Sequence, residues 1–203
     1  MKKEISIVYI DDKLDNLLSR YIDEFSDSDF EFRSTEIRFT DKYKNFELLL
    51  EENALKTSDI VIIDSKLFED REVTEKFSGE EFKLIYTTGH PYSKIFVITQ
   101  NEGLEKFGTI KKYDTRAMGS KTATEYYDEV LGEKIKEASN EILQKRRILE
   151  KLKGNSEFYG DSLVVDKIDE LMEGSSSYKD LTDDKIDELI LLIENTIKPK
   201  LDE

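Results

Sequence analysis

The sequence predicts an α/β fold in which a five-stranded parallel, doubly wound sheet is followed by an α-helical tail. Over the first half of the chain, short apolar runs rich in β-branched residues alternate with helical patterns, as in βαβ units. Two of these runs, residues 5–10 and 60–63, end abruptly in aspartates. The carboxyl ends of parallel strands meet at one edge of the sheet, where ligands bind. We therefore expect Asp11, Asp12 and Asp64 to converge there.

The elements between these two runs follow in order. Residues 15–25 carry apolar side chains at helical spacing, and residues 30–39 alternate as a strand does. Residues 42–56 again show helical spacing and predict a second helix. The apolar side chains of this helix expected to face the sheet are Leu48, Leu49 and Leu55.

Two further runs complete the predicted sheet. Residues 94–99 end in the hydroxyl of Thr99, and residues 108–112 end in the cation of Lys112. The segment between them, residues 101–107, has room for only a short helix.

The order acid pair, single acid, hydroxyl and lysine at successive strand ends resembles the receiver domain of two-component response regulators, over roughly residues 4–115. Residues 11–18 resemble the acid pair and following helix of that family, and residues 78–85 resemble its glycine-led third helix. The resemblance implies the flavodoxin-like strand order 2-1-3-4-5. Three departures stand out: Tyr113 replaces a usual proline, Gln100 replaces a small residue, and the chain carries extra residues before Gly79.

The resemblance also implies roles for individual residues. Asp64 would be the phosphoacceptor. Thr99 would sense the phosphoryl group, and Lys112, or alternatively Lys111, would pair with it. Phosphoryl transfer to a carboxylate depends mainly on positioning and charge neutralisation, which these residue types supply.

A divalent cation completes the set that the resemblance implies. Mg²⁺ prefers oxygen ligands and keeps several waters. Asp11, Asp12 and Asp64, with the backbone carbonyl of Lys66, are the expected ligands. The structural alternative for any one of them is a cap, because an aspartate after a strand, such as Asp12, commonly caps a helix.

Composition narrows the function further. The chain has 203 residues, no cysteine and a formal net charge of −15, which disfavours nucleic-acid binding. No apolar run is long enough to span a membrane, and no signal peptide is visible, so we expect a cytoplasmic protein without membrane contact. His90, the only histidine, lies in a turn sequence and is expected to be a loop residue. The basic cluster is interpreted as a solvated helix face, or alternatively as a contact for an acidic partner; it consists of Lys145, Arg146 and Arg147 with Lys151 and Lys153.

The tail reads as entirely helical. We predict a receiver-like domain over residues 1–118 and a helical extension over residues 119–203, with a long helix at 122–153 and shorter helices at 163–172 and 182–198. The last helix needs an apolar partner, which could be the long helix, a second copy of the chain in a homodimer, or another protein. Its apolar residues are Leu181, Ile186, Leu189, Ile190, Leu192, Ile193 and Ile197.

Two functions of different classes follow. In the first, a partner histidine kinase phosphorylates Asp64, and the receiver acts on a protein effector through its tail or through the face formed by the fourth helix and the fifth strand. In the second, the receiver-like body is a phosphorylation-independent scaffold whose tail mediates assembly. We expect no enzymatic turnover of its own. A related phosphohydrolase is disfavoured because such enzymes carry a second acid where this chain has Lys66.

Overall fold

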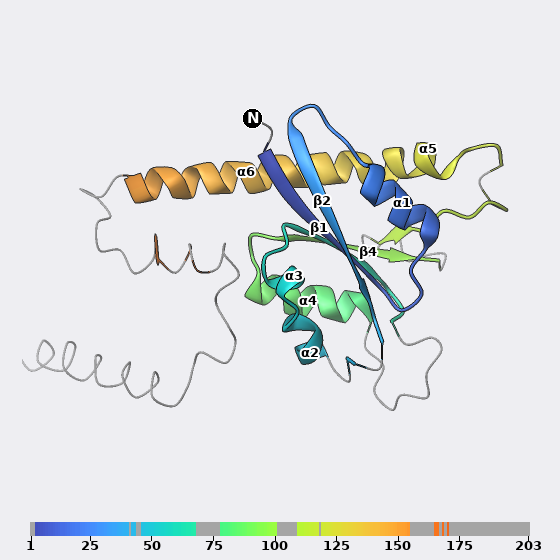
Figure 1. Ribbon diagram of the computed structural model, residues 1–203, viewed down its shortest axis with the longest axis horizontal. Helices are drawn as coiled ribbons and strands as arrows, with labels where there is room; N and C mark the ends of the chain where they lie inside the picture. Colours follow the sequence, from blue (N-terminus) through green and yellow to red (C-terminus); the bar gives the residue numbers. More distant parts are fainter. Residues whose placement is uncertain are drawn as a thin grey trace, which may run out of the picture.

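The five strands form one parallel sheet in the order β2-β1-β3-β4-β5, so the predicted doubly wound, flavodoxin-like architecture is confirmed. The computed structural model describes residues 3–40, 42–43, 46–67, 78–100, 109–117, 119–154, 165–166, 168 and 170. The strands are β1 (Lys3–Asp11), β2 (Phe30–Arg38), β3 (Ile60–Asp64), β4 (Lys94–Thr99) and β5 (Ile110–Lys111). Each lies where the apolar runs predict it (Figure 1).

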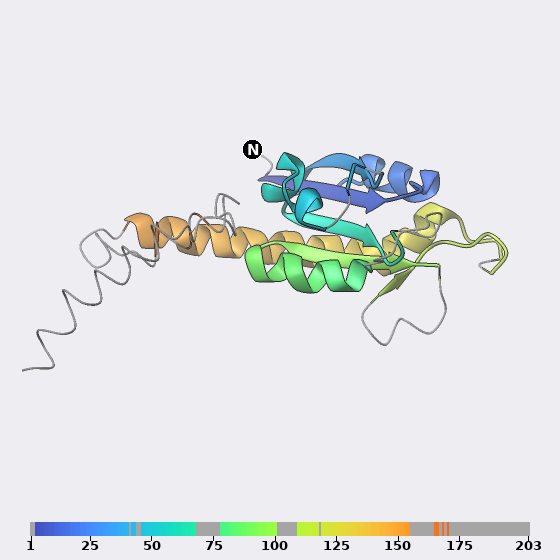
Figure 2. The same cartoon turned by 90° about the horizontal axis from the view of Figure 1, so that it is seen from below.

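Helices cover both faces of this sheet (Figures 1 and 2). They are α1 (Asn16–Glu24), α2 (Phe46–Leu50), α3 (Asn53–Lys56), α4 (Gly79–Gly89), α5 (Ala123–Tyr127), the π-helical turn η2 (Asp128–Gly132) and α6 (Glu133–Gly154). Successive side chains of a strand point to opposite faces. Accordingly, Ile5, Ile7 and Tyr9 of β1 pack in the core beneath α1, α5 and α6, whereas Val8 and Ile10 pack in the core beneath α2, α3 and α4.

The predicted second helix is interrupted. Where one helix is predicted, residues 46–50 and 53–56 form two short helices, α2 and α3, because Glu52 between them has an extended backbone. The Glu52 carboxylate accepts hydrogen bonds from the Tyr43 hydroxyl and from the ammonium of Lys42, which holds the residue out of a continuous helix. As a result, Leu49 and Leu55 are buried as predicted, but Leu48 is 39% exposed and does not face the sheet.

The long helix runs from residue 123 to residue 154, close to the prediction, but contains a π-helical turn that the sequence pattern does not reveal. At this turn the Tyr21 hydroxyl donates to Asp128 Oδ1 (3.0 Å). A Cβ atom at Gly132 would lie 2.8 Å from the same hydroxyl. The turn and the glycine together accommodate the tyrosine of α1.

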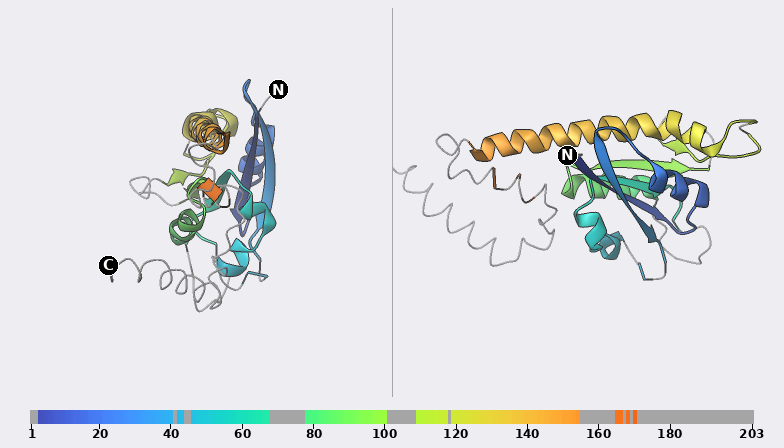
Figure 3. Two further views of the ribbon diagram at one scale, coloured as in Figure 1. Left: turned by 90° about the vertical axis from the view of Figure 1, so that its left-hand side faces the viewer. Right: turned by 45° about the horizontal axis from the view of Figure 1, so that its top comes forward.

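Helix α6 lies along the sheet and continues past it (Figure 3). Near its far end Arg146 donates to Asp59 Oδ1 (2.5 Å) and to the backbone oxygen of Glu4 (3.2 Å). Glu141 pairs with Lys94 of β4 (2.5 Å). The interpretation of the basic cluster as a purely solvated face is therefore wrong for Arg146, which fastens α6 to the sheet.

The remaining predictions for the tail are only partly covered by the structure. The helix at 182–198 lies outside the described residues, as does the short helix at 101–107, and 163–172 is described at only four positions. The domain boundary at 118/119 stays a prediction, although Tyr127, Leu131 and Ile135 beyond it pack in the same core as the sheet. None of the helices in the described part of the chain is long and apolar enough to cross a membrane.

Candidate functional site

The predicted residues meet at the carboxyl edge of the sheet. Asp11, Asp64 and Thr99 are the last residues of β1, β3 and β4, and Lys112 directly follows β5. They border one pocket of about 320 Å³. The residues that line it are Asp11, Asp12, Lys13, Leu14, Asp15, Asp64, Lys66, Thr99, Gln100 and Lys112.

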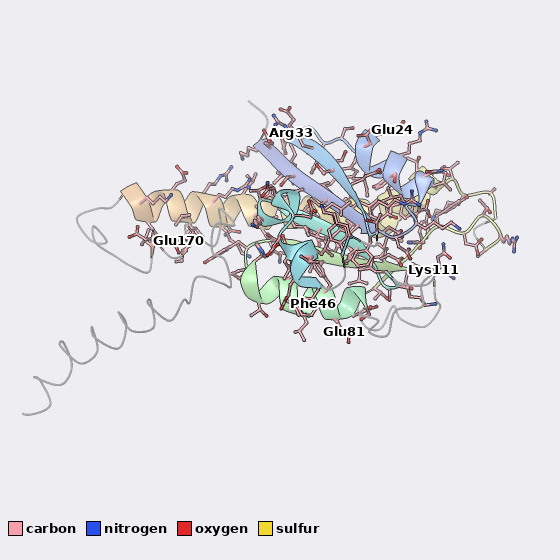
Figure 4. All side chains as sticks on the ribbon, turned by 60° about the horizontal axis from the view of Figure 1, so that its bottom comes forward. Glu24, Arg33, Phe46, Glu81, Lys111 and Glu170 are labelled. Carbon is pink, nitrogen blue, oxygen red and sulfur yellow. The ribbon has the colours of Figure 1, made fainter. Side chains whose placement is uncertain are left out.

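The Lys112 ammonium lies between the two buried carboxylates. Its Nζ atom is 2.7 Å from Asp11 Oδ2 and 2.6 Å from Asp64 Oδ1. All three side chains are at least 90% buried. Lys112, and not Lys111, therefore faces the site. Figure 4 places Lys111 at the β5 edge of the molecule.

Backbone donors hold the other carboxylate oxygens. Asp11 Oδ1 accepts from the N–H of Lys13 (3.0 Å), and Asp64 Oδ2 accepts from the N–H of Lys66 (2.8 Å). Both donors lie two residues after their aspartate, the pattern of an Asx turn. Lys66 thus contacts the site through its N–H, and the contact through its carbonyl stays a prediction.

Tyr9 is part of the site and is not identified by strand-end reasoning. Its buried hydroxyl donates to Asp11 Oδ2 (2.5 Å) and accepts from the N–H of Asp15 (3.2 Å). The signal that could have found it is the strand period of two, which places residue 9 on the same face as residue 11.

Burial and the neighbouring opposite charges shift the pKa values of Asp64 and Lys112 in opposite directions, whereas burial and the Asp11 carboxylate both raise the pKa of Tyr9. Burial raises the pKa of the Asp64 carboxyl, and the neighbouring Lys112 ammonium only partly opposes this. Burial by itself would lower the pKa of Lys112, but Asp64 and Asp11 outweigh it, so the pKa of Lys112 is raised. The pKa of Tyr9 is raised by burial and by Asp11, which keeps the hydroxyl protonated as a donor.

The start of helix α4 packs closely against the backbone of Asp64. A Cβ atom at Gly79 would lie 2.3 Å from the backbone oxygen of Asp64, so only glycine allows this approach. The Gly79 N–H donates to the Ser65 backbone oxygen (3.0 Å), and the Ser65 hydroxyl contacts both carboxylate oxygens of Glu80 (2.8 and 2.9 Å). Ser78 caps the helix with a reciprocal capping box.

The other side of the pocket is fixed by backbone and tyrosine contacts. The Lys112 N–H donates to the Thr99 backbone oxygen (2.7 Å), which aligns the two residues. The Tyr113 N–H donates to the Tyr127 hydroxyl (3.1 Å), and the Tyr126 hydroxyl donates to the Lys111 backbone oxygen (2.8 Å). A proline at position 113 could not make the first of these bonds. The departure at Tyr113 therefore ties the end of β5 to α5.

The donor chemistry suits a hard cation, since four aspartates border one pocket. As they stand, however, no three acidic, histidine or cysteine side chains among the described residues form a ready metal site. Lys112 instead offsets part of the charge of Asp11 and Asp64. Mg²⁺ binding at Asp11, Asp12 and Asp64 stays a prediction.

No protein-family model matches the sequence, and no curated protein matches it either. Among solved structures, the response regulator domain of CheB from Thermotoga maritima is similar over 69% of this chain and 97% of that domain, with 14% sequence identity and a TM-score of 0.39. The fold assignment rests on the strand order of the sheet itself.

Replacing Lys112 by Met should strongly destabilise the protein, because it leaves two buried carboxylates without their counter-ion. Breaking such a pair typically costs about 3–5 kcal/mol. The pKa of Asp64, already raised by burial, loses its main opposing influence, so the folded state binds protons more readily than the unfolded state. The loss of unfolding free energy relative to the wild type should therefore become smaller as the pH falls from 7 towards 5. Urea unfolding at several pH values would measure it.

The matched control is Lys134→Met, which makes the same change at an exposed position of α6. We expect a much smaller loss of stability with little dependence on pH. Equal losses in the two variants would show that the ion pair with Asp11 and Asp64 does not stabilise the fold.

Substituting Gly79 by Ala should displace either the start of α4 or the backbone of Asp64, because the added methyl group meets main-chain atoms that cannot move aside. Overpacking of this kind costs about 1–3 kcal/mol. Thermal unfolding would measure the loss. A variant as stable as the wild type would contradict the close approach. Gly154→Ala is a control, because nothing lies within 4 Å of its added Cβ.

Proposed function

We propose that this protein is a response-regulator receiver that accepts a phosphoryl group on Asp64 from a partner histidine kinase. The observation that carries the proposal is the buried ammonium of Lys112, held between Asp11 and Asp64 in a pocket that Thr99 also borders. A carboxylate nucleophile, a fixed cation and a hydroxyl are the protein groups that phosphoryl transfer to aspartate needs.

The transfer is a substitution at phosphorus. One Asp64 carboxylate oxygen attacks the phosphorus of the donor's phosphohistidine, the P–O bond forms, and the P–N bond breaks with its electron pair left on the imidazole. Lys112 stays beside the carboxylate and offsets the charge that the phosphoryl group brings. The Lys66 N–H holds Asp64 Oδ2 and so fixes the orientation of the nucleophile.

Mg²⁺ is the proposed cofactor, with Asp11, Asp12, Asp64 and the backbone carbonyl of Lys66 as its ligands. When bound it would neutralise phosphoryl oxygens during the transfer. The chain's own part is to present carboxylates at the end of β1 and β3 and to keep them oriented through the N–H groups of Lys13 and Lys66.

The proposed output is a protein contact. The formal net charge of −15 supports an effector other than nucleic acid. Candidate surfaces are the helical tail, including self-association as a homodimer, and the face of the fourth helix and fifth strand that the resemblance to receivers implies. We propose that the protein acts in the cytoplasm and has no turnover of its own.

A phosphorylation-independent scaffold is the second candidate. The observations that favour it are the hydrogen bonds of Tyr113 and Tyr126 that tie β5 to α5. These bonds stiffen the edge of the sheet that a receiver would have to rearrange when it switches.

The deciding experiment treats the full chain with acetyl phosphate, with and without Mg²⁺, and records intact mass. We expect one phosphoryl adduct that requires Mg²⁺ and is absent in Asp64→Asn. The matched control is Asp59→Asn, which changes a buried aspartate at the opposite edge of the sheet and should leave the adduct intact.

The other outcomes are equally informative. A wild-type protein that stays unmodified at saturating Mg²⁺ and donor would favour the scaffold. An adduct that persists in Asp64→Asn would place the modification elsewhere and contradict the role of Asp64.

A further inference from the structure

A tyrosine hydroxyl contacts both ends of the loop that carries two of the proposed metal ligands. Asp11 and Asp12 lie between the end of β1 and Asp15, the residue that caps α1 through the N–H groups of Leu17 and Leu18. The Tyr9 hydroxyl contacts both ends of this loop, at Asp11 Oδ2 and at the Asp15 N–H.

These contacts are made in the interior. Tyr9 and Asp11 are each 1% exposed, so water does not compete for the hydrogen bond between them. The 2.5 Å separation lies in the range of strong bonds from a hydroxyl to a carboxylate. A phenylalanine ring would fill the same apolar space, so the hydroxyl can be removed while the packing of the core is kept.

From this geometry we infer that Tyr9 is a positioning residue that orients Asp11 and the loop of Asp12 for a divalent cation. The inference rests on the proposed function and adds a residue to it. Tyr9 touches neither the cation nor the phosphoryl group and acts only through Asp11 and Asp15. Groups that hydrogen-bond a metal-ligating carboxylate typically change metal affinity 10–100-fold when removed.

The test is Tyr9→Phe in the full chain, which deletes one oxygen atom and keeps the ring. Titration calorimetry with Mg²⁺ should show about tenfold weaker binding than in the wild type. The Mg²⁺ concentration that gives half the maximal rate of phosphorylation by acetyl phosphate should rise by a similar factor. The rate at saturating Mg²⁺ should stay near the wild-type value.

The matched control is Tyr86→Phe. Tyr86 is also fully buried, and its hydroxyl donates to the Leu55 backbone oxygen (2.8 Å) in the core on the other face of the sheet. This variant should lose stability without changing Mg²⁺ affinity. If Tyr9→Phe is too unstable to titrate, an osmolyte such as trimethylamine N-oxide, which favours the folded state, is added to the variant and the wild type alike.

The possible failures are distinguishable. Unchanged Mg²⁺ affinity in Tyr9→Phe, beside a wild type that binds Mg²⁺ and is phosphorylated, would overturn this inference alone. A loss confined to the maximal rate, or to stability as in Tyr86→Phe, would also overturn it. A wild-type protein that binds no Mg²⁺ would overturn the inference together with the metal site of the proposed function.

Discussion

The ion pair of Lys112 with Asp11 and Asp64 is the interaction on which the site depends, and it is also a constraint on the fold. Three charged groups from three separate chain segments are buried at one edge of the sheet. Burying any of them alone would be costly, because an unpaired charge loses its hydration without compensation. The strand order places β1 next to β3 and β5 within reach of both. The strand order therefore brings the three charged groups together, and their pairing in turn stabilises that strand order.

The opposite edge of the sheet is fixed by a different set of polar contacts. Asp59, just before β3, accepts hydrogen bonds from the backbone and side chain of Ser6 and from Arg146 of α6. Between the two edges β1, β3 and β4 are almost wholly apolar. The two kinds of contact have different effects. Burial of apolar side chains stabilises the fold but is not directional, whereas the hydrogen bonds and ion pairs at the two edges fix how β1, β3 and α6 are aligned.

Much of this arrangement follows from the sequence because it depends on local patterns. The strands were predictable from their β-branched runs, and Asp11, Asp64 and Thr99 from their places at strand ends. The choice of Lys112 over Lys111 required knowing where β5 ends. Three other features depend on tertiary contacts, which the periodicity of the sequence does not reveal. They are the break at Glu52, the π-helical turn against Tyr21 and the approach of Gly79 to Asp64. Tyr9 could have been found, because it shares a strand face with Asp11.

The charge balance of the pocket bears on the choice between receiver and scaffold. A scaffold that needed Lys112 for stability would require only one buried carboxylate as its partner. This site holds two, Asp11 and Asp64, so the buried carboxylates outnumber the buried ammonium of Lys112 that lies between them. Clustered carboxylates repel one another, and burial adds to the cost by raising the pKa of Asp64. An unfavourable excess of negative charge gives no benefit to packing. It would be favourable if a divalent cation bound there, and for this reason the charge of the pocket favours the proposed receiver over the scaffold.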